Sequence, residues 1–221
     1  MSIWRKSLIF FALLLLAAGG AVYWAKFRLI EHGFTTDTNT RQFIIGNDVL
    51  EIPLNLMRFA VQREKTVLQQ ADLVMHWSDA SGFQSTNSDK FLDPAHTMEL
   101  VFLTIGERQL HLAMNDRVVP IYQKLISAIE RSGPSGLIIR PFKPGAGYDG
   151  EELVFASDGN IVWAARCQSA EASQFPTCIR DVFVGAGLTA TYRFSRSLLG
   201  YWADIETRIS LKLDELVVTG R

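Results

Sequence analysis

The feature that most constrains this chain is an apolar run near its N-terminus. The eighteen residues from Leu8 to Ala25 carry no charge. A helix rises about 1.5 Å per residue, so such a run is roughly 27 Å long, close to the hydrocarbon thickness of a bilayer. Trp4 and Trp24 lie on either side of the run and suit the two membrane interfaces. The sequence therefore predicts a transmembrane anchor, with residues 1–28 forming a short cytoplasmic tail and the membrane helix.

A cleavable signal peptide is the alternative interpretation of the same run. Arg5 and Lys6 would form its positive n-region, and Gly19-Gly20-Ala21 would supply small residues for cleavage. The retained anchor is favoured because the run exceeds a typical signal-peptide core. Interfacial aromatic residues also follow the cut that a signal peptide would require.

The orientation of the anchor rests on its surroundings. Lysine and arginine are equally frequent on the two flanks, so their distribution does not set the orientation. The short N-terminal tail, the long C-terminal remainder and the cysteine pair described below favour a cytoplasmic N-terminus. We therefore expect a single-pass protein of the plasma (inner) membrane. Its N-terminal helix would contact the lipid bilayer, and its C-terminal domain would face outside the cytoplasm.

The remainder of the chain has the composition of a water-soluble domain. Residues 29–41 are rich in threonine and predict a spacer, and residues 42–221 predict a globular domain. Two β subdomains, 42–132 and 133–221, are a finer division of it. This length is enough for one substantial core or two small ones. Lys and Arg number 22 against 23 Asp and Glu, so no excess charge indicates a nucleic-acid partner.

Alternating apolar residues and turn formers predict strands in the first half of the domain. Phe43–Ile45 and Val49–Ile52 are expected to flank a turn that contains glycine and asparagine. Asp72–Trp77 is a further predicted strand. Met98–Met114 predicts a hairpin whose strands meet at Gly106-Glu107, a two-residue turn with glycine first.

The second half predicts an antiparallel meander. Its expected strands are Leu137–Phe142, Leu153–Ala156, Asn160–Cys167, Cys178–Val184 and Leu188–Phe194. In the last of these, apolar residues alternate with Thr189, Thr191 and Arg193. Since successive side chains point to opposite faces of a strand, this pattern gives one apolar and one polar face.

Apolar residues spaced by three and four predict two helices. One covers Val118–Ile129, with Asp116 as its N-cap. The other runs from Leu198 to Leu216, with Ser197 as its N-cap and an apolar stripe expected to pack across the meander. The predicted fold class is therefore α+β, with a transmembrane helix followed by a β-rich antiparallel domain and two packed helices.

The two cysteines lie at the facing ends of neighbouring predicted strands. Cys167 and Cys178 are eleven residues apart, and antiparallel pairing would bring them together. A disulfide there would stabilise the fold by about 3 kcal/mol, through the lost entropy of the unfolded chain. Such bonds persist outside the cytosol, in agreement with the preferred orientation. Two unpaired cysteines in a cytosolic domain are the alternative.

Several further residues are interpreted as structural. Gly145–Gly150 spells G-x-G-x-x-G, but Pro144 precedes it and a predicted strand follows. We therefore interpret it as a hairpin loop and not as a nucleotide site. Asp149, Glu151 and Glu152 are interpreted as a solvated acidic face.

Histidines and aromatic residues also lack a pattern that indicates a site. The histidines have no metal-binding spacing, so we expect no metal and no cofactor; they are His32, His76, His96 and His111. His76 and His111 are expected at the surface or its boundary. The alternating aromatic residues of the meander are assigned to the core and not to an aromatic cleft; they are Phe155, Trp163, Tyr192 and Phe194.

The anchor, the spacer and the missing catalytic signatures favour a non-enzymatic binding or interaction module, with an envelope protein as its expected partner and catalytic residues unknown. The second hypothesis is a membrane-anchored hydrolase whose site is assembled only in the fold. The third is a small-molecule or lipid-binding domain. Converging acids or a Ser/His pair in a cleft would favour the hydrolase, and an apolar cavity of ligand size would favour the third hypothesis.

Overall fold

The computed structural model describes residues 12, 14–16, 18–21 and 33–218. Most of the predicted anchor, Leu8–Ala25, lies outside the described residues. Within the described part, no helix combines the length and the apolar character needed to cross a bilayer.

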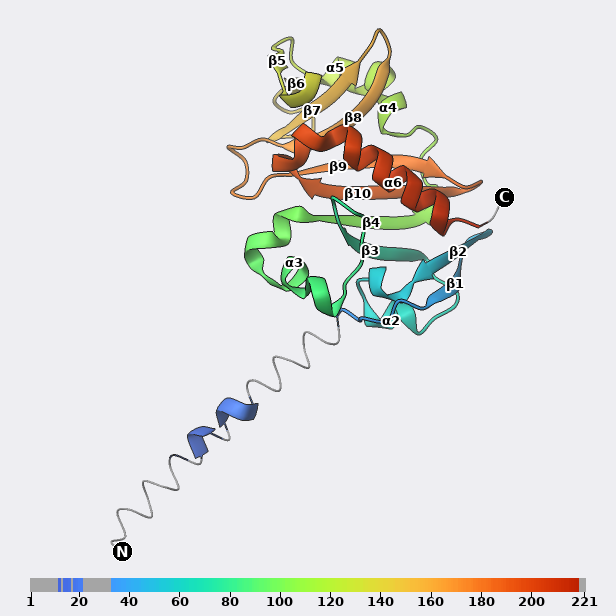
Figure 1. The fold of residues 1–221 in the computed structure, drawn as a ribbon. Coiled ribbons are helices and arrows are strands. Elements are labelled where there is room, and N and C mark those ends of the chain that lie inside the picture. The colour runs from blue at the N-terminus through green and yellow to red at the C-terminus, as the bar shows by residue number, and fades with distance from the viewer. Residues whose placement is uncertain (1–11, 13, 17, 22–32, 219–221) are drawn as a thin grey trace, which may run out of the picture.

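The described chain has a mixed α+β fold built on a large antiparallel sheet, as expected (Figure 1). Eight of the described strands form this sheet in the order β3-β4-β10-β9-β8-β7-β6-β5. They are β3 (Gln70–His76), β4 (Leu100–Glu107), β5 (Arg131–Ser132), β6 (Ile138–Pro141), β7 (Glu151–Ser157), β8 (Ile161–Gln168), β9 (Thr177–Val184) and β10 (Leu188–Ser195). A separate hairpin is formed by β1 (Thr40–Ile45) and β2 (Asp48–Pro53).

Helix α6 (Trp202–Leu216) covers one face of the sheet (Figure 1). Ile205, Ile209 and Leu213 on its inner side are each 3% exposed or less. Strand β10 contributes Leu188, Ala190, Tyr192 and Phe194 to the same core. Each large apolar side chain buried in this way stabilises the fold by roughly 1.5–3 kcal/mol before entropy is counted. The predicted apolar stripe and its packing are therefore confirmed.

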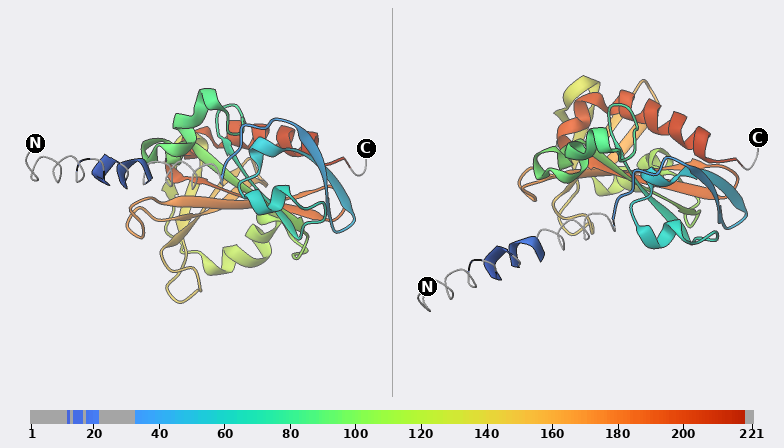
Figure 2. Two further views of the ribbon diagram at one scale, coloured as in Figure 1. Left: turned by 90° about the horizontal axis from the view of Figure 1, so that it is seen from below. Right: turned by 60° about the horizontal axis from the view of Figure 1, so that its bottom comes forward.

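Short helices cover the two ends of the opposite face, and those near β7 and β8 lie across the sheet from α6 (Figure 2). Near β7 and β8, α4 (Met114–Arg117), α5 (Gln123–Leu125) and the turn between them bury Tyr122 against Phe142 and Phe155. Near β3 and β4, α3 (Ser88–Leu92) packs its Phe91 on Val74 and Leu100. Between these two covers, the middle of this face is open.

Strands β8 and β9 separate over most of their length. Their register contains Arg166 opposite Ile179 and Cys167 opposite Cys178, whereas β7 and β8 pair from Glu151 to Ser157. Beyond the cysteines, Arg180 fills the gap and donates from Nη1 to the carbonyl oxygen of Ala164 (2.9 Å) and to Oδ1 of Asn115 on α4 (2.5 Å). A buried guanidinium thus replaces part of the missing strand pairing.

The strands predicted for the second half are confirmed, with boundaries that differ by one or two residues at most ends. Gly159 and Gly185 adopt positive φ values of 104° and 58° in the β7–β8 and β9–β10 turns, where glycine is least strained. The β1–β2 hairpin and the strand near Asp72–Trp77 are confirmed as well.

The predicted hairpin over Met98–Met114 is wrong. Its first strand is β4, but Gly106-Glu107 belongs to that strand, and residues 108–113 form no strand. The partners of β4 are β3 and β10. Pairing with β10 buries Leu188 and Tyr192 completely, whereas Leu110 in the expected return strand stays 54% exposed. The distant strand therefore wins because it buries more apolar surface.

The predicted helix over Val118–Ile129 is also corrected. Helical structure begins earlier, with α4 at Met114, widens to a π-type turn over Val118–Tyr122, and ends with α5 at Leu125. Asp116 lies inside α4 and is not an N-cap. Pro120 lies in this wide turn. Proline has no backbone N–H to donate, and in a regular α-helix its ring would clash with the preceding turn.

The cap predicted at Ser197 is wrong as well. A 3₁₀ turn over Arg196–Tyr201 precedes α6, and its cap is Ser195, whose side chain accepts a hydrogen bond from the Ser197 backbone N–H.

Candidate functional site

The open middle of the sheet face opposite α6 forms a groove of about 570 Å³. Its floor is made by side chains of β3, β4, β10 and β9, and its walls come from the segments around Phe59, Met98 and Phe175. The volume falls within the roughly 300–1,000 Å³ range of ligand sites. Phe175 and Phe59 are 63% and 41% exposed, so two aromatic rings on the walls face solvent.

The floor consists of two rows of side chains that cross the strands. In one row Asp72, Thr104 and Thr191 are successive cross-strand neighbours, followed by Asp181 on β9. In the other row Phe102 is paired with Arg193, which in turn is opposite Ile179. The expected alternation in β10 is confirmed, because its Thr191 and Arg193 lie on this face and not in the α6 core.

The acids in and beside the groove are already engaged. Asp72 accepts hydrogen bonds from the Thr104 hydroxyl at 2.7 Å and from Gln62 Nε2 at 2.8 Å. Asp181 is buried and forms an ion pair with Arg117 of α4. Asp72 thus connects β3 to β4 and to Gln62, Asp181 connects β9 to α4, and neither forms an ion pair with an arginine of the groove.

Arg58 in the groove and Arg166 outside it lie against aromatic rings. The Arg58 guanidinium lies 5.0 Å from the ring centres of both Phe59 and Phe102. Further along the same face, Arg166 lies 4.7 Å from the Tyr148 ring and 3.6 Å from a Glu151 oxygen. Stacking of this kind holds a flat guanidinium in place while its N–H groups stay available.

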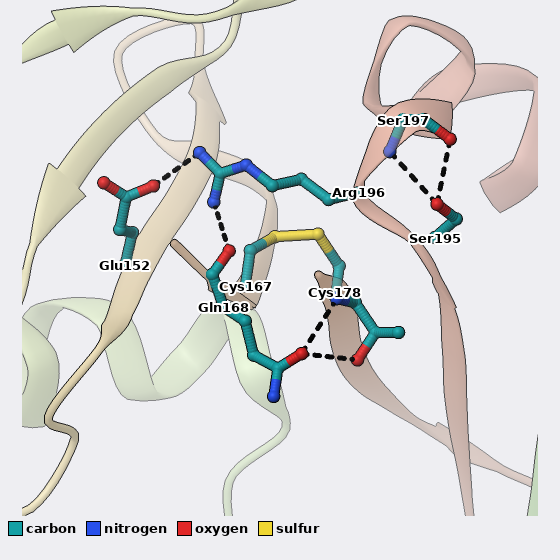
Figure 3. Close-up of a disulfide and its surroundings, with 8 residues drawn as sticks. Glu152, Cys167, Gln168, Cys178, Ser195, Arg196 and Ser197 are labelled. Carbon is teal, nitrogen blue, oxygen red and sulfur yellow. Dashed lines mark hydrogen bonds and ion pairs between the residues drawn. A yellow bond between two sulfur atoms is a disulfide. The ribbon is translucent and has the colours of Figure 1, made fainter. Parts of the chain in front are cut away.

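The disulfide joins β8 to β9 (Figure 3), at the two ends of the loop that carries Phe175. The structure joins the sulfur atoms of Cys167 and Cys178, which are fully buried. Residues 169–176 form the loop between them, and the Gln168 side chain accepts a hydrogen bond from the Thr177 N–H at 3.1 Å. The two cysteines predicted from the sequence therefore close the neck of a loop that borders the groove.

Glu152 lies next to this disulfide and corrects one sequence interpretation. It is 2% exposed and forms ion pairs with Arg131 and with Arg196 Nη2, the latter at 2.5 Å. Arg196 also donates to the carbonyl oxygen of Gln168 at 2.7 Å (Figure 3). Asp149 is solvated as predicted, but Glu152 is not. Its place on the inward side of β7 explains the burial, and its two arginine partners make the burial tolerable.

The aromatic residues of the meander are core, as predicted. Trp163, Tyr192 and Phe194 are each no more than 1% exposed on the α6 side, and Phe155 is buried on the other side. The Tyr192 hydroxyl and Trp163 Nε1 both donate to Glu206 of α6. Burial is the main cause that raises the pKa of Tyr192 well above its usual range.

His76 is also buried, at 4% exposure, and is not the boundary residue that was expected. Its Nε2 lies 3.0 Å from a Glu99 oxygen, and its Nδ1 lies 3.0 Å from the Ser78 hydroxyl. The hydrogen bond with His76 is the main cause that lowers the pKa of Glu99. Ser78 and His76 are two residues apart at the end of β3, and neither lines the groove, so this pair fixes a turn.

The remaining sequence candidates form no site within the described residues. Gly145–Gly150 connects β6 to β7 as a hairpin loop, as predicted, and Gly145, Gly147 and Gly150 have positive φ values. No cluster of three or more metal-ligating side chains occurs among the residues that the structure describes. His111 is exposed in the segment before α4.

Sequence reasoning missed most of the groove. Arg58, Phe59 and Phe175 carry no motif and belong to segments that the sequence left ambiguous or unassigned. Arg193 was placed on a polar face by strand alternation, which is the one local signal for the site. The other residues become neighbours only through the non-local pairing of β4 with β10.

No protein-family model and no curated protein matches this chain. Among solved structures, an immunity protein of the Stenotrophomonas maltophilia type IV secretion system is similar, with a TM-score of 0.54 and 11% identity over 82% of this chain and 94% of that one. The iron-regulated outer membrane lipoprotein FrpD of Neisseria meningitidis is similar with a TM-score of 0.50 and 10% identity, over 83% of this chain and 96% of that one. At these identities the likeness shows a shared fold.

Proposed function

We propose that this protein is a non-enzymatic interaction module of the cell envelope that binds a partner protein through the groove. The observation that carries this proposal is the composition of the groove, in which exposed Phe59 and Phe175 flank Arg58, Arg193 and Met98. Aromatic residues, methionine and arginine are the types enriched at protein–protein interfaces. The names of the two similar structures, an immunity protein and an outer membrane lipoprotein, support an envelope role.

The use of the acidic residues supports a binding role over a catalytic one. Asp181 and Glu206 each hold a buried arginine, and Asp72 is held by neighbouring hydroxyl and amide groups. A general acid or base must be free to exchange a proton with a substrate. These carboxylates instead join structural elements to each other.

Photo-crosslinking in native membranes tests the groove as the interaction surface. A photoreactive phenylalanine analogue is placed in the full chain at Phe175, on the groove wall, or at Leu211, which is 59% exposed on α6 at the opposite face. We expect a defined protein adduct from position 175 and none from position 211. Adducts from position 211 alone, or no protein adduct from position 175, would refute the proposal.

A small-molecule site is the second candidate, and the volume of about 570 Å³ favours it. Native mass spectrometry of the purified full chain would show a bound compound of constant mass. A bound compound that is lost when Thr104→Trp fills the floor, in a protein that gives no protein adduct at position 175, would favour this candidate over a protein partner.

We further propose that residues 1–28 anchor the domain at the plasma (inner) membrane, with the domain outside the cytoplasm. The buried Cys167–Cys178 bond supports this side of the membrane, because such bonds persist outside the cytosol. Alkaline carbonate should leave the protein in the membrane pellet, and protease added to spheroplasts should digest the domain. Release into the supernatant would indicate a cleaved N-terminus, and protection from protease would reverse the orientation.

A further inference from the structure

Phe102 on the groove floor has one arginine over its ring and a second arginine beside it on the neighbouring strand. The Arg58 guanidinium carbon is 5.0 Å from the Phe102 ring centre. Arg193 is the direct antiparallel neighbour of Phe102, and the Cβ atoms of such pairs lie roughly 4.5–5.5 Å apart. Arg58 comes from the segment before α2 (Ala60–Arg63), and Arg193 comes from β10. The fold therefore brings two arginines from distant parts of the chain into one groove, one over the Phe102 ring and one on the neighbouring strand.

These two cations have no anionic partner within the described part of the chain. Arg58 and Arg193 take part in none of the ion pairs found there. The acids that face the groove are engaged elsewhere: Asp72 with Thr104, Gln62 and Gln70, Asp181 with Arg117, and Glu151 with Arg166. The groove therefore holds two arginines without an ion-pair partner against one carboxylate, Asp72, whose hydrogen-bond partners are neutral.

We propose that Arg58 and Arg193 form a clamp for a carboxylate, and that the occupant of the groove is an acidic segment of the partner protein. An Asp or Glu side chain of that segment lies over Phe102, and its apolar neighbours pack on Phe59 and Phe175. A guanidinium binds a carboxylate with two parallel hydrogen bonds, and the stacking of Arg58 on two rings fixes its orientation beforehand. This inference rests on the proposed function of the groove.

The surroundings of the clamp favour a polypeptide over a lipid. An acyl chain needs a continuous apolar lining, but the floor beside Phe102 carries the hydroxyl groups of Thr104 and Thr191. The wall residue Phe175 is 63% exposed and so does not enclose the groove. Backbone amides and carbonyls of an extended segment can bond to these hydroxyl groups, whereas a hydrocarbon tail leaves them unpaired.

Selection from a random-peptide phage library tests the chemistry of the occupant. The bait is the full chain in nanodiscs of zwitterionic phosphatidylcholine, and selected peptides are then measured by fluorescence anisotropy. We expect peptides in which Asp or Glu adjoins aromatic or aliphatic residues. Arg58→Glu and Arg193→Glu should each weaken their affinity on the order of tenfold or more. Arg208→Glu, which changes an exposed arginine on the opposite face, is the matched control and should leave affinity unchanged.

Charge exchange provides the specific readout. Peptides with Lys in place of the selected acid should bind the Arg193→Glu variant better than they bind the unmodified protein. Higher salt should weaken the binding of the original acidic peptides to the unmodified protein. Selected peptides without acidic residues, or affinities that ignore both charge reversals, would overturn the clamp. Groove-dependent binding to phosphatidylglycerol vesicles in place of peptides would overturn it as well.

The same variants separate this inference from the function on which it rests. A Phe175 crosslink that persists in Arg58→Glu and Arg193→Glu would remove the clamp and leave the interaction module. Absence of any protein crosslink at Phe175 in the unmodified chain would remove both.

Discussion

Glu206 joins α6 to the sheet through a buried group of hydrogen bonds. Its carboxylate accepts from Arg180 Nη2 at 2.8 Å, from Arg180 Nε at 2.9 Å, and from Trp163 and Tyr192. Burial by itself would raise the pKa of Glu206, but the hydrogen bonds and charge of Arg180 lower it below the usual value of 4.5. The ionised form is therefore the form that the fold requires.

Replacing this carboxylate should destabilise the protein strongly. Glu206→Gln leaves the buried Arg180 without its anion, and removal of one member of such a pair costs about 3–5 kcal/mol. We expect a lower urea midpoint at pH 7. Glu215→Gln on the same helix, where the Glu215 side chain is 65% exposed beside Lys212, should change the unfolding free energy by less than about 1 kcal/mol. Equal losses in the two variants would contradict the role assigned to Glu206.

The effect of Glu206 should depend on pH in one direction. Because its folded pKa lies below the unfolded value, its contribution is fully present above about pH 4.5 and is lost as pH falls through the folded pKa. The difference in unfolding free energy between the unmodified protein and Glu206→Gln should therefore shrink on acidification. A difference that is constant between pH 7 and pH 3 would show that the charge is not its source.

At the scale of elements, α6 supplies a matched pair of positions for measuring what its packing contributes. Ile209 is 3% exposed against the sheet, whereas Leu211 is 59% exposed on the same helix. Ile209→Ala should cost about 2–5 kcal/mol by removing buried methyl groups and leaving a cavity. Leu211→Ala should stay within about 0.5 kcal/mol. Denaturant unfolding measures both, and a similar loss in the two variants would mean that α6 does not seal the core.

Elements with a strong local pattern were predictable from the sequence. The strands of the second half alternate clearly and are separated by Asp158-Gly159 and Gly185-Ala186-Gly187, so neighbouring strands pair with each other. The stripe of α6 likewise needs no distant information. These elements form the side of the sheet that holds the core, which explains why the core was predicted well.

Elements that depend on distant partners were not predictable. The hairpin expected at Gly106-Glu107 fails because β10, more than eighty residues later, offers β4 a better buried face. The α-helix expected over Val118–Ile129 is interrupted near Pro120. The helical spacing of apolar residues continues through this segment, but proline cannot donate the backbone hydrogen bond that a regular α-helix requires. The groove depends on the first of these non-local contacts, and so Arg58 and Phe175 could not be assigned to it from the sequence.

At the scale of the whole molecule, the disulfide connects two parts of the sheet that share few backbone hydrogen bonds. Beyond Cys167 and Cys178, the strands β8 and β9 diverge around Arg180. The double variant Cys167→Ala/Cys178→Ala should lose about 3 kcal/mol through the freed loop entropy. Differential scanning calorimetry should show the lower Tm.

The same variant should change the groove locally. Since the bond closes the neck of the loop 169–176, limited proteolysis should cleave that loop faster in the double variant. Without reductant, neither cysteine of the unmodified protein should react with a thiol reagent. Ready labelling of both would remove the bridge and weaken the proposed extracytoplasmic orientation.

The strand order has a consequence for how the protein is made. Two interior strands of the sheet, β10 and β9, come after all its other strands along the chain. Until the ribosome has synthesised them, β4 and β8 have no neighbour on their inner sides, and an open strand edge invites pairing with other chains. The sheet therefore cannot close until residues 177–195 have been synthesised, and until then the two open edges expose the nascent chain to pairing with other chains.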